Sequence, residues 1–239
     1  MKLPTLPLSL LIVFVCLISV SAQKQKSRAA GQTAVVIDES LSVLRMQPSL
    51  YGFPLQRMRR GRRVQIVGMT EADGVKFYKV AASRAKFGWI QSDALAGKFR
   101  TDDEVRFVRL IQAADGFDQI ELASAFLQLH PSSRFRAPML LLFGDLLENV
   151  AAKLSRDASS RLNRREIAAS GAPVHSFYLN LAMLDRYRKL GITFLFDGAT
   201  RTFHYNGWSW NEIVRKYQGS TEAAEATKRI ESLRTKMEN

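Results

Sequence analysis

Few residues of this chain have the types and spacing that catalysis or metal binding requires. The three histidines, His130, His175 and His204, show no metal-ligand spacing. The only cysteine, Cys16, lies inside an apolar run near the N-terminus. If that run is removed, the chain has no thiol for nucleophilic catalysis, metal ligation or a disulfide. We therefore expect no metal site and no cofactor.

Carboxylates offer little more for catalysis. Glycoside hydrolysis would require two carboxylates that face one cleft, whereas Glu121, Asp145 and Glu148 have the pattern of ordinary helix-surface residues. His130 stands beside Pro131, where we expect the end of a helix and a capping or surface role rather than a catalytic base. The sequence therefore favours a protein without catalytic activity.

Aromatic residues are the stronger candidates for ligand contact. A tyrosine presents both a ring face and a hydroxyl group to a peptide or a sugar. Packing is the alternative role, and for Trp89 we expect the core to be the main one. The ligand-binding candidates are Tyr51, Phe53, Tyr78, Trp89, His204, Tyr205, Trp208 and Trp210.

Short runs of β-forming residues must position the first four of these candidates. Turn residues such as Pro48-Ser49 and Ala72-Asp73-Gly74 separate the runs, and each run is too short for a helix. Val64 and Ile66 alternate with polar neighbours, as a sheet with one buried face requires. Five such strands enclose a core only by closing on themselves, so we predict a small β-barrel over residues 34–97. The predicted strands are 34–37, 41–44, 63–67, 76–80 and 87–90.

This region resembles the bacterial SH3 (SH3b) domain in the order and spacing of several motifs. These motifs are Ser42-Val43, Pro48-Ser49, Leu55, Met58, Gly61, the pair Val64/Ile66, Phe77-Tyr78-Lys79-Val80, Gly88-Trp89-Ile90 and Leu95. The chain departs from the family at Leu44, where the family usually has arginine, and at Phe77, where it usually has tryptophan. The resemblance implies a non-catalytic targeting or binding module for cell-wall peptides or glycans.

The second half, residues 98–239, has the spacing of helices. Asp102, Asp103 and Glu104 place negative charge at a helix start, and Pro138 suits the first turn of a longer helix. Short breaks such as Gln218-Gly219-Ser220 indicate antiparallel neighbours. The first predicted helix begins near residue 102 and ends by residue 115. The other predicted helices span residues 119–129, 138–154, 163–169, 174–189, 211–217 and 221–237.

Two turns in this half are alike. Residues 126–133 and 213–220 both place an aromatic residue, a helix breaker and a serine N-cap between two helices. Between them, Leu140, Phe143, Gly144 and Leu147 resemble the opening of a tetratricopeptide (TPR) unit, in which the glycine lets two helices approach closely. Arg156 and Ser160 depart from the family pattern. The resemblance implies divergent TPR-like hairpins, whose concave surface binds protein or peptide partners.

One segment does not fit a purely helical array. Residues 192–196 and 201–205 alternate around the turn signal Asp197-Gly198, so we predict a β-hairpin that leads into Trp208 and Trp210. One interpretation is an aromatic platform for a glycan or peptide, with His204 as a contact. The other is that these aromatic residues, with Phe194 and Phe196, fix the hairpin to the helices.

The N-terminus indicates a compartment. Lys2 precedes an apolar run of roughly 15 residues, shorter than the roughly 20 of a spanning helix, and Val20-Ser21-Ala22 suits cleavage before Gln23. We predict a secretory signal over residues 1–22 and a flexible leader over 23–33, with an uncleaved anchor as the alternative. Phe14-Val15 before Cys16 argues against lipid anchoring.

The net charge of the chain indicates a further class of partner. The net charge of +13 favours anionic polymers, although a solvated basic surface is an equal explanation. We expect an exported, periplasmic or extracellular binding or scaffold protein of the cell envelope, with a wall polymer or envelope protein as partner and at most peripheral membrane contact. A wall-remodelling enzyme or its accessory is the first alternative. A nonspecific nucleic-acid binder is the second, and export argues against it.

Overall fold

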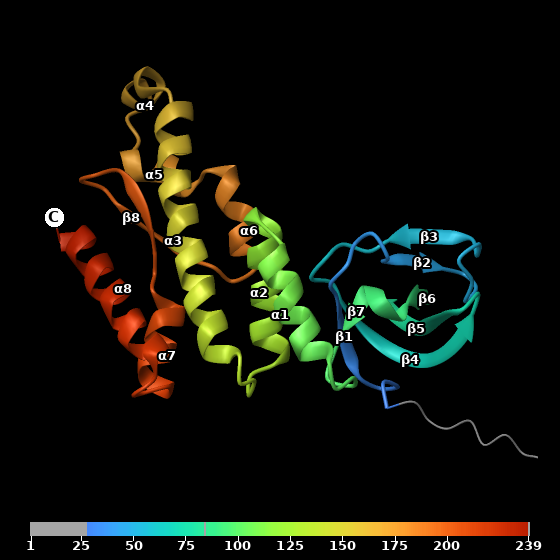
Figure 1. Ribbon diagram of the computed structural model, residues 1–239. Coiled ribbons are helices and arrows are strands. Elements are labelled where there is room, and N and C mark those ends of the chain that lie inside the picture. Colours follow the sequence, from blue (N-terminus) through green and yellow to red (C-terminus); the bar gives the residue numbers. More distant parts are fainter. Residues whose placement is uncertain (1–27, 84, 239) are drawn as a thin grey trace, which may run out of the picture.

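The computed structural model describes residues 28–83 and 85–238. The predicted signal, residues 1–22, and residues 23–27 of the predicted leader lie outside this part. The described chain forms an antiparallel sheet of seven strands followed by a mainly helical half, so the expected mixture of β and α structure is confirmed. Figure 1 shows the two parts side by side. Among the described helices, none has the length and apolarity that crossing a bilayer requires.

The N-terminal half is one antiparallel sheet that curls around its own core (Figure 1). Its spatial order is β3-β2-β6-β5-β4-β1-β7, so β3 and β7 are edges and the prediction of a closed barrel is wrong. Register shifts between Ile66 and Gly68 and between Ala81 and Ser83 bend the long strands over the core without closure. The strands are β1 (Thr33–Val36), β2 (Val43–Arg45), β3 (Pro54–Arg57), β4 (Arg63–Ala72), β5 (Val75–Ser83), β6 (Lys86–Gln91) and β7 (Leu95–Ala96), with a 3-10 turn η1 (Ser92–Ala94) before β7.

The five predicted strands are present with shifted ends, whereas β3 and β7 were not indicated by the sequence pattern. Strand β3 begins with Pro54 and has no buried residue, so it shows no alternation of apolar and polar residues. Strand β7 has two residues, too few for any pattern. Both are edge strands, so each pairs with a single neighbouring strand.

Gly88 allows β6 to approach β2 closely. A Cβ atom at Gly88 would lie 2.7 Å from Leu44 Cγ and 2.9 Å from the Arg45 carbonyl oxygen, so no side chain fits at this position. The expected core position of the neighbouring Trp89 is wrong, because Trp89 lies on the outer face and is only half-buried. Leu44, Ile66 and Ile90 fill the core instead.

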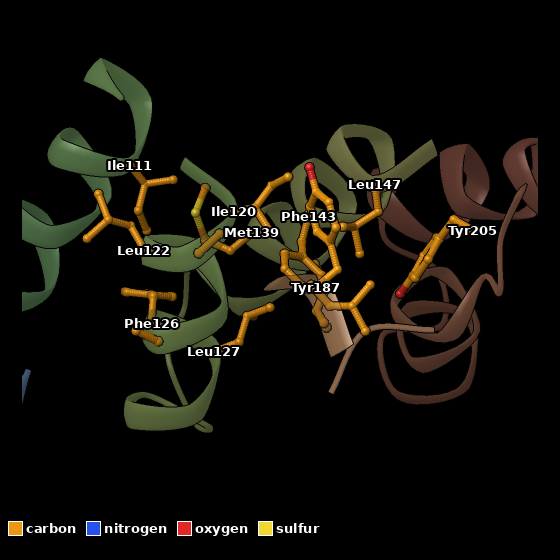
Figure 2. Close-up of a cluster of buried hydrophobic side chains, with 14 of the residues drawn as sticks. Ile111, Ile120, Leu122, Phe126, Leu127, Met139, Phe143, Leu147, Tyr187 and Tyr205 are labelled. Atoms are coloured by element: carbon orange, nitrogen blue, oxygen red, sulfur yellow. The ribbon is translucent and has the colours of Figure 1, made fainter. Parts of the chain in front are cut away.

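The helical half is organised around the long helix α3. Helices α2 and α7, helix α8 and strand β9 all pack against α3 (Figure 1), and Figure 2 shows the apolar side chains continuing from Ile111 to Tyr205. Gly144 of α3 lies against Ser209 and Trp210 of α7, so the predicted close approach at this glycine is confirmed. The elements are α1 (Asp103–Ala113), α2 (Gly116–Leu129), α3 (Arg136–Arg161), α4 (Arg164–Ser170), α5 (Val174–Leu179), η2 (Ala182–Leu184), α6 (Asp185–Arg188), β8 (Phe194–Asp197), β9 (Thr202–Tyr205), α7 (Trp208–Lys216) and α8 (Thr221–Glu238).

The predicted helix over residues 174–189 is wrong, because the chain breaks after Leu179 into α5, η2 and α6. Nine residues span two and a half helical turns, so a continuous helix would place Tyr178 and Tyr187 on opposite faces. Both tyrosines are buried, Tyr178 stacked on Phe196 and Tyr187 against Phe194. The extended backbone at Leu181 lets both rings reach the same hairpin.

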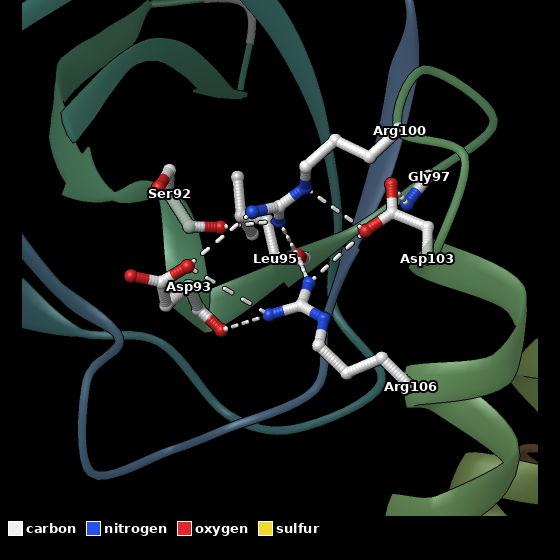
Figure 3. Close-up of polar contacts among 7 residues, drawn as sticks. All are labelled: Ser92, Asp93, Leu95, Gly97, Arg100, Asp103 and Arg106. Atoms are coloured by element: carbon white, nitrogen blue, oxygen red, sulfur yellow. Dashed lines mark hydrogen bonds and ion pairs between the residues drawn. The ribbon is translucent and has the colours of Figure 1, made fainter.

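The two halves share a core and a polar junction. Val35, Ile37 and Ala96 of the sheet belong to the apolar cluster of the helical half. At the junction, Asp103 Oδ1 accepts hydrogen bonds from Arg100 Nε at 3.0 Å and from Arg106 Nη2 at 3.1 Å, and its Oδ2 accepts from the Gly97 N–H at 3.1 Å. Both guanidinium groups also donate to the Leu95 carbonyl (Figure 3). Asp103 is therefore a buried anchor that fixes α1 to the sheet, beyond its predicted place at a helix start.

Candidate binding sites

The first candidate site is the loop over residues 46–53 between β2 and β3, which we call the aromatic loop. Tyr51 is 91% exposed, Phe53 64% and Met46 57%. The Met46 N–H donates to the Phe53 carbonyl at 3.0 Å, so these two residues face each other across the loop. Three large apolar side chains on one short loop form a surface suited to a ligand.

An aspartate in a different turn holds the aromatic loop in place. Asp73 Oδ2 accepts from Ser49 Oγ at 2.7 Å and from the Leu50 N–H at 2.8 Å, and these bonds, the Ser49 bond first, lower the pKa of Asp73. Asp73 and Gly74 have positive φ angles of 53° and 70° and form the tight turn between β4 and β5. The loop is therefore pre-organised by a turn that the sequence predicts.

Cations flank the aromatic loop on the outer face of the sheet. Arg45, Trp89 and Lys79 are neighbours in register across β2, β6 and β5, so their side chains share one face. Arg45 Nη1 also donates to the Gly52 carbonyl at 2.9 Å. Residues 34–97 hold ten Arg and Lys against five Asp and Glu. This surface combines aromatic rings with positive charge.

Tyr78 does not belong to this surface. It is 4% exposed, and its ring packs edge-on against Phe99 at a centroid distance of 5.5 Å. Burial raises the pKa of its hydroxyl. Phe77, its neighbour in β5, is also fully buried, so both faces of the strand are covered here. The expected role of Tyr78 in a groove is therefore corrected to packing.

The second candidate site is a cavity of about 250 Å³ beside the hairpin, which we call the hairpin groove. Its wall includes the segment that leads from α6 into β8, and Trp208, 50% exposed, lies at its rim. None of the lining residues is charged, and a few neutral polar groups interrupt an apolar floor, as in many ligand pockets. They are Ser124, Leu127, Gln128, Phe143, Leu147, Leu190, Gly191, Ile192, Thr193, Tyr205, Asn206 and Trp208.

The other aromatic residues after the hairpin are packed rather than displayed. Tyr205 and Trp210 are both buried and make an edge-on contact at 5.4 Å. His204 is also buried, with Nδ1 3.3 Å from Glu148 Oε1 and Nε2 3.0 Å from Thr202 Oγ1. The expectation of an open platform at these residues is wrong, and the alternative of packing against the helices is confirmed for them. Trp208 alone among the candidates here keeps an exposed ring.

Glu148 is not the ordinary surface residue that we expected. Burial opposes its ionisation, but hydrogen bonds from Lys236, from the Tyr205 N–H and from His204 outweigh that effect and lower the pKa of the carboxyl. Lys236 Nζ lies 2.8 Å from Oε1 and the Tyr205 nitrogen 2.9 Å from Oε2. The carboxylate therefore ties α3 to both β9 and α8.

Asp145 and Glu148 line one polar cavity of about 240 Å³ between α3 and α8. Asp145 pairs with Arg229 at 3.1 Å, and Glu148 pairs with Lys236. Glycoside hydrolysis requires one carboxylic acid with a raised pKa, whereas that of Glu148 is lowered. Glu148 therefore does not supply the proton donor that such a pair requires. Glu121, the remaining acidic candidate, lies in the first half of α2 beside Gly61, and burial raises the pKa of its carboxyl.

Thr202, His204 and Glu148 follow one another as hydroxyl, imidazole and carboxylate, the order found in nucleophilic hydrolases. The Thr202 hydroxyl also lies 2.6 Å from Thr200 Oγ1, and Thr200 bonds to Asp197 in the hairpin turn. We interpret this series as polar bonds that stabilise the hairpin. Among the described residues, no three His, Cys, Asp or Glu side chains are grouped to hold a metal ion.

Comparisons with known proteins give no match among protein-family models, curated proteins or solved structures. The candidate sites therefore depend on geometry alone. The sequence identified Tyr51, Phe53 and Trp208, which are exposed, but missed the roles of Asp73 and Glu148. The sequence analysis also did not identify Met46 or the helix break at Leu190-Gly191. Met46 could have been found, because a large apolar residue in a turn-rich segment indicates an exposed contact surface.

Proposed function

We propose that this chain is an exported, non-catalytic binding or scaffold protein of the cell envelope. In this proposal the SH3b-like sheet binds a cell-wall peptide or glycan through the aromatic loop. The observation that supports it best is the near-complete exposure of Tyr51 on a loop fixed by Asp73. A pre-organised loop loses little conformational entropy when a ligand binds, so its exposed rings contribute directly to affinity.

The charge beside the loop favours an anionic ligand. Arg45 and Lys79 flank the half-buried ring of Trp89, and basic residues outnumber acidic ones throughout residues 34–97. Wall polymers with carboxylate or phosphate groups match this surface. Tyrosine and phenylalanine rings suit the apolar faces of sugars and peptides, so ring contacts supply the part of the affinity that salt does not screen.

The helical half supports a scaffold role. The hairpin groove lies on different elements from the aromatic loop, and it has an uncharged lining suited to an apolar side chain. In this proposal the helices form divergent TPR-like hairpins that bind a protein. The shared core and the Asp103 junction hold the two halves in one arrangement. We propose that the chain positions a protein partner relative to the wall. Its predicted signal over residues 1–22 supports export.

Co-sedimentation of the purified protein with insoluble peptidoglycan, measured at rising salt, tests this function. The double variant Tyr51→Ser/Phe53→Ser should lose at least tenfold in affinity and keep its fold by circular dichroism. Val67→Ser is the matched control, because Val67 is also an exposed apolar residue of this sheet but lies on β4. Salt-resistant binding in the wild type and the control supports the proposal.

Two outcomes contradict it. Binding that disappears with salt alone, equally in all variants, would reduce the interaction to nonspecific charge. Release of soluble wall fragments during incubation would show that the chain is an enzyme, and the non-catalytic function would then be abandoned.

A further inference from the structure

The outer edges of β8 and β9 differ in their hydrogen bonding to the rest of the protein. On β9, the Phe203 N–H donates to Ser155 Oγ at 2.7 Å and the Tyr205 N–H donates to Glu148 Oε2 at 2.9 Å. Both acceptors belong to α3, so side chains of α3 satisfy the outer edge of β9. A residue whose N–H points outward does not use it within the ladder.

The outward N–H groups of Phe203 and Tyr205 show which residues of β8 hydrogen-bond to β9 and which point away from it. Phe203 and Tyr205 stand opposite Phe196 and Phe194 in the register, so these two pairs are the non-hydrogen-bonded pairs. The ladder bonds then belong to Leu195 with His204 and to Asp197 with Thr202. The backbone N–H and C=O groups of Phe194 and Phe196 therefore point to the outer edge of β8. In the described part of the chain, no hydrogen bond from another element reaches them.

Strand β8 also lacks the features that normally protect an edge. Proteins use lysine, proline or a bulge to prevent pairing with another strand, and β8, which reads Phe-Leu-Phe-Asp, has none of these three; its short length of four residues is the one protection it keeps. Leu195 is 39% exposed, and its register with β9 has no shift. An apolar, flat and unpaired edge can accept a partner that supplies backbone donors and acceptors, which is the chemistry of an extended peptide.

The hairpin groove lies at the start of this edge. Its wall includes Ile192 and Thr193, the two residues that run directly into β8. A peptide that continued past Phe194 would reach the groove with a side chain. Lys189 is exposed beside Leu190 of the wall, and Arg63 donates to Gln128 of the lining. These cations around an uncharged groove favour an acidic residue next to an apolar one.

We propose that the β8 edge binds an extended peptide of a partner protein as a third strand, with one large apolar side chain in the hairpin groove and an acidic residue beside it. Strand addition derives affinity from main-chain hydrogen bonds and specificity from the pocket for alternate side chains. This inference deepens the proposed function, because it specifies the protein partner of the helical half. It does not depend on wall binding.

The test uses a random octapeptide library displayed on phage and selected on the whole protein. Selected peptides should alternate β-forming residues and carry a large apolar residue beside Asp or Glu. Each is then synthesised in two forms, N-methylated at odd or at even residues, and affinity is measured by fluorescence polarisation. One methylation phase should weaken binding at least tenfold and the other should not, since only one phase faces β8.

Protein variants complete the test. Leu195→Lys places a charge on the unprotected strand and should weaken the selected peptide about tenfold, whereas Phe53→Ser in the aromatic loop should leave it unchanged. Equal loss in both methylation phases, or no enrichment over bare support, overturns the proposal. So does a concentration-dependent dimer that excludes the peptide, since a second copy would then occupy the edge. Because Phe53→Ser is expected to weaken wall binding and Leu195→Lys peptide binding, failure of this proposal is distinguishable from failure of the proposed function.

Discussion

Gly144 of α3 and Trp210 of α7 lie in direct contact, with no room for a side chain between the two helices. A Cβ atom at Gly144 would stand 2.6 Å from Ser209 Oγ and closer still to Trp210 Nε1. Trp210 is among the largest fully buried side chains. The absence of one methyl group thus sets the distance at which α7, and the hairpin before it, pack on α3.

Gly144→Ala should therefore lower the free energy of unfolding. A Cβ atom this close to Ser209 and Trp210 places the overpacking cost at the upper end of its usual range, about 3 kcal/mol, of which the better helix propensity of alanine offsets only about 1 kcal/mol. Urea denaturation measures the difference. Gly198→Ala is the control, because a Cβ atom there meets open space. A Gly144→Ala protein as stable as the wild type would contradict the packing described.

The Asp103 junction should be costly to break. Asp103→Asn removes a buried charge from between Arg100 and Arg106, which are partly exposed, and should destabilise the protein by about 1.5–3 kcal/mol. Asp93→Asn removes an exposed partner of the same arginines and should cost at most about 1 kcal/mol. Thermal unfolding of both variants gives the comparison, and similar losses in the two would refute the special role of Asp103.

Glu148 should make stability depend on acid pH. Its pKa in the folded protein is lowered from the ordinary value of 4.5, so its contribution is complete above that value and is lost as pH falls through the lower, folded pKa. The free energy of unfolding should decrease on acidification below about pH 4.5, and less steeply in Glu148→Gln. Parallel pH profiles for the two proteins would show that Glu148 does not contribute.

The anchor of the aromatic loop can be tested without a ligand. Asp73→Gly keeps the positive φ angle of the turn but removes the acceptor for Ser49 and Leu50. Amide hydrogen exchange at Leu50 should then accelerate at least tenfold. Asp73→Asn tolerates the same backbone conformation and retains an acceptor oxygen, so most of the protection should persist. Unchanged exchange in Asp73→Gly would mean that the loop is fixed by other contacts.

Local patterns predicted much of this fold. The alternation around Val64 and Ile66 and the turn at Asp73-Gly74 were readable, because each depends on neighbours in the sequence. The close approach at Gly144 was indicated only by the resemblance of its surroundings to a TPR unit, since its partner Trp210 lies on a distant helix. The burial of Tyr78 and the break before Leu181 were not, since each depends on what a distant element covers. The role of Glu148 was not predicted for the same reason, because its partners come from β9 and α8.

The core shared between the halves limits how this chain can be divided. Residues 34–97, if excised, would expose Val35, Ile37 and Ala96, and the helical half would lose the same apolar cover. Arg100 and Arg106 would also lose their carbonyl acceptors at Leu95. We therefore expect sheet and helices to melt in one cooperative transition. Recombination or domain grafting would have to move them together, as a single inherited unit.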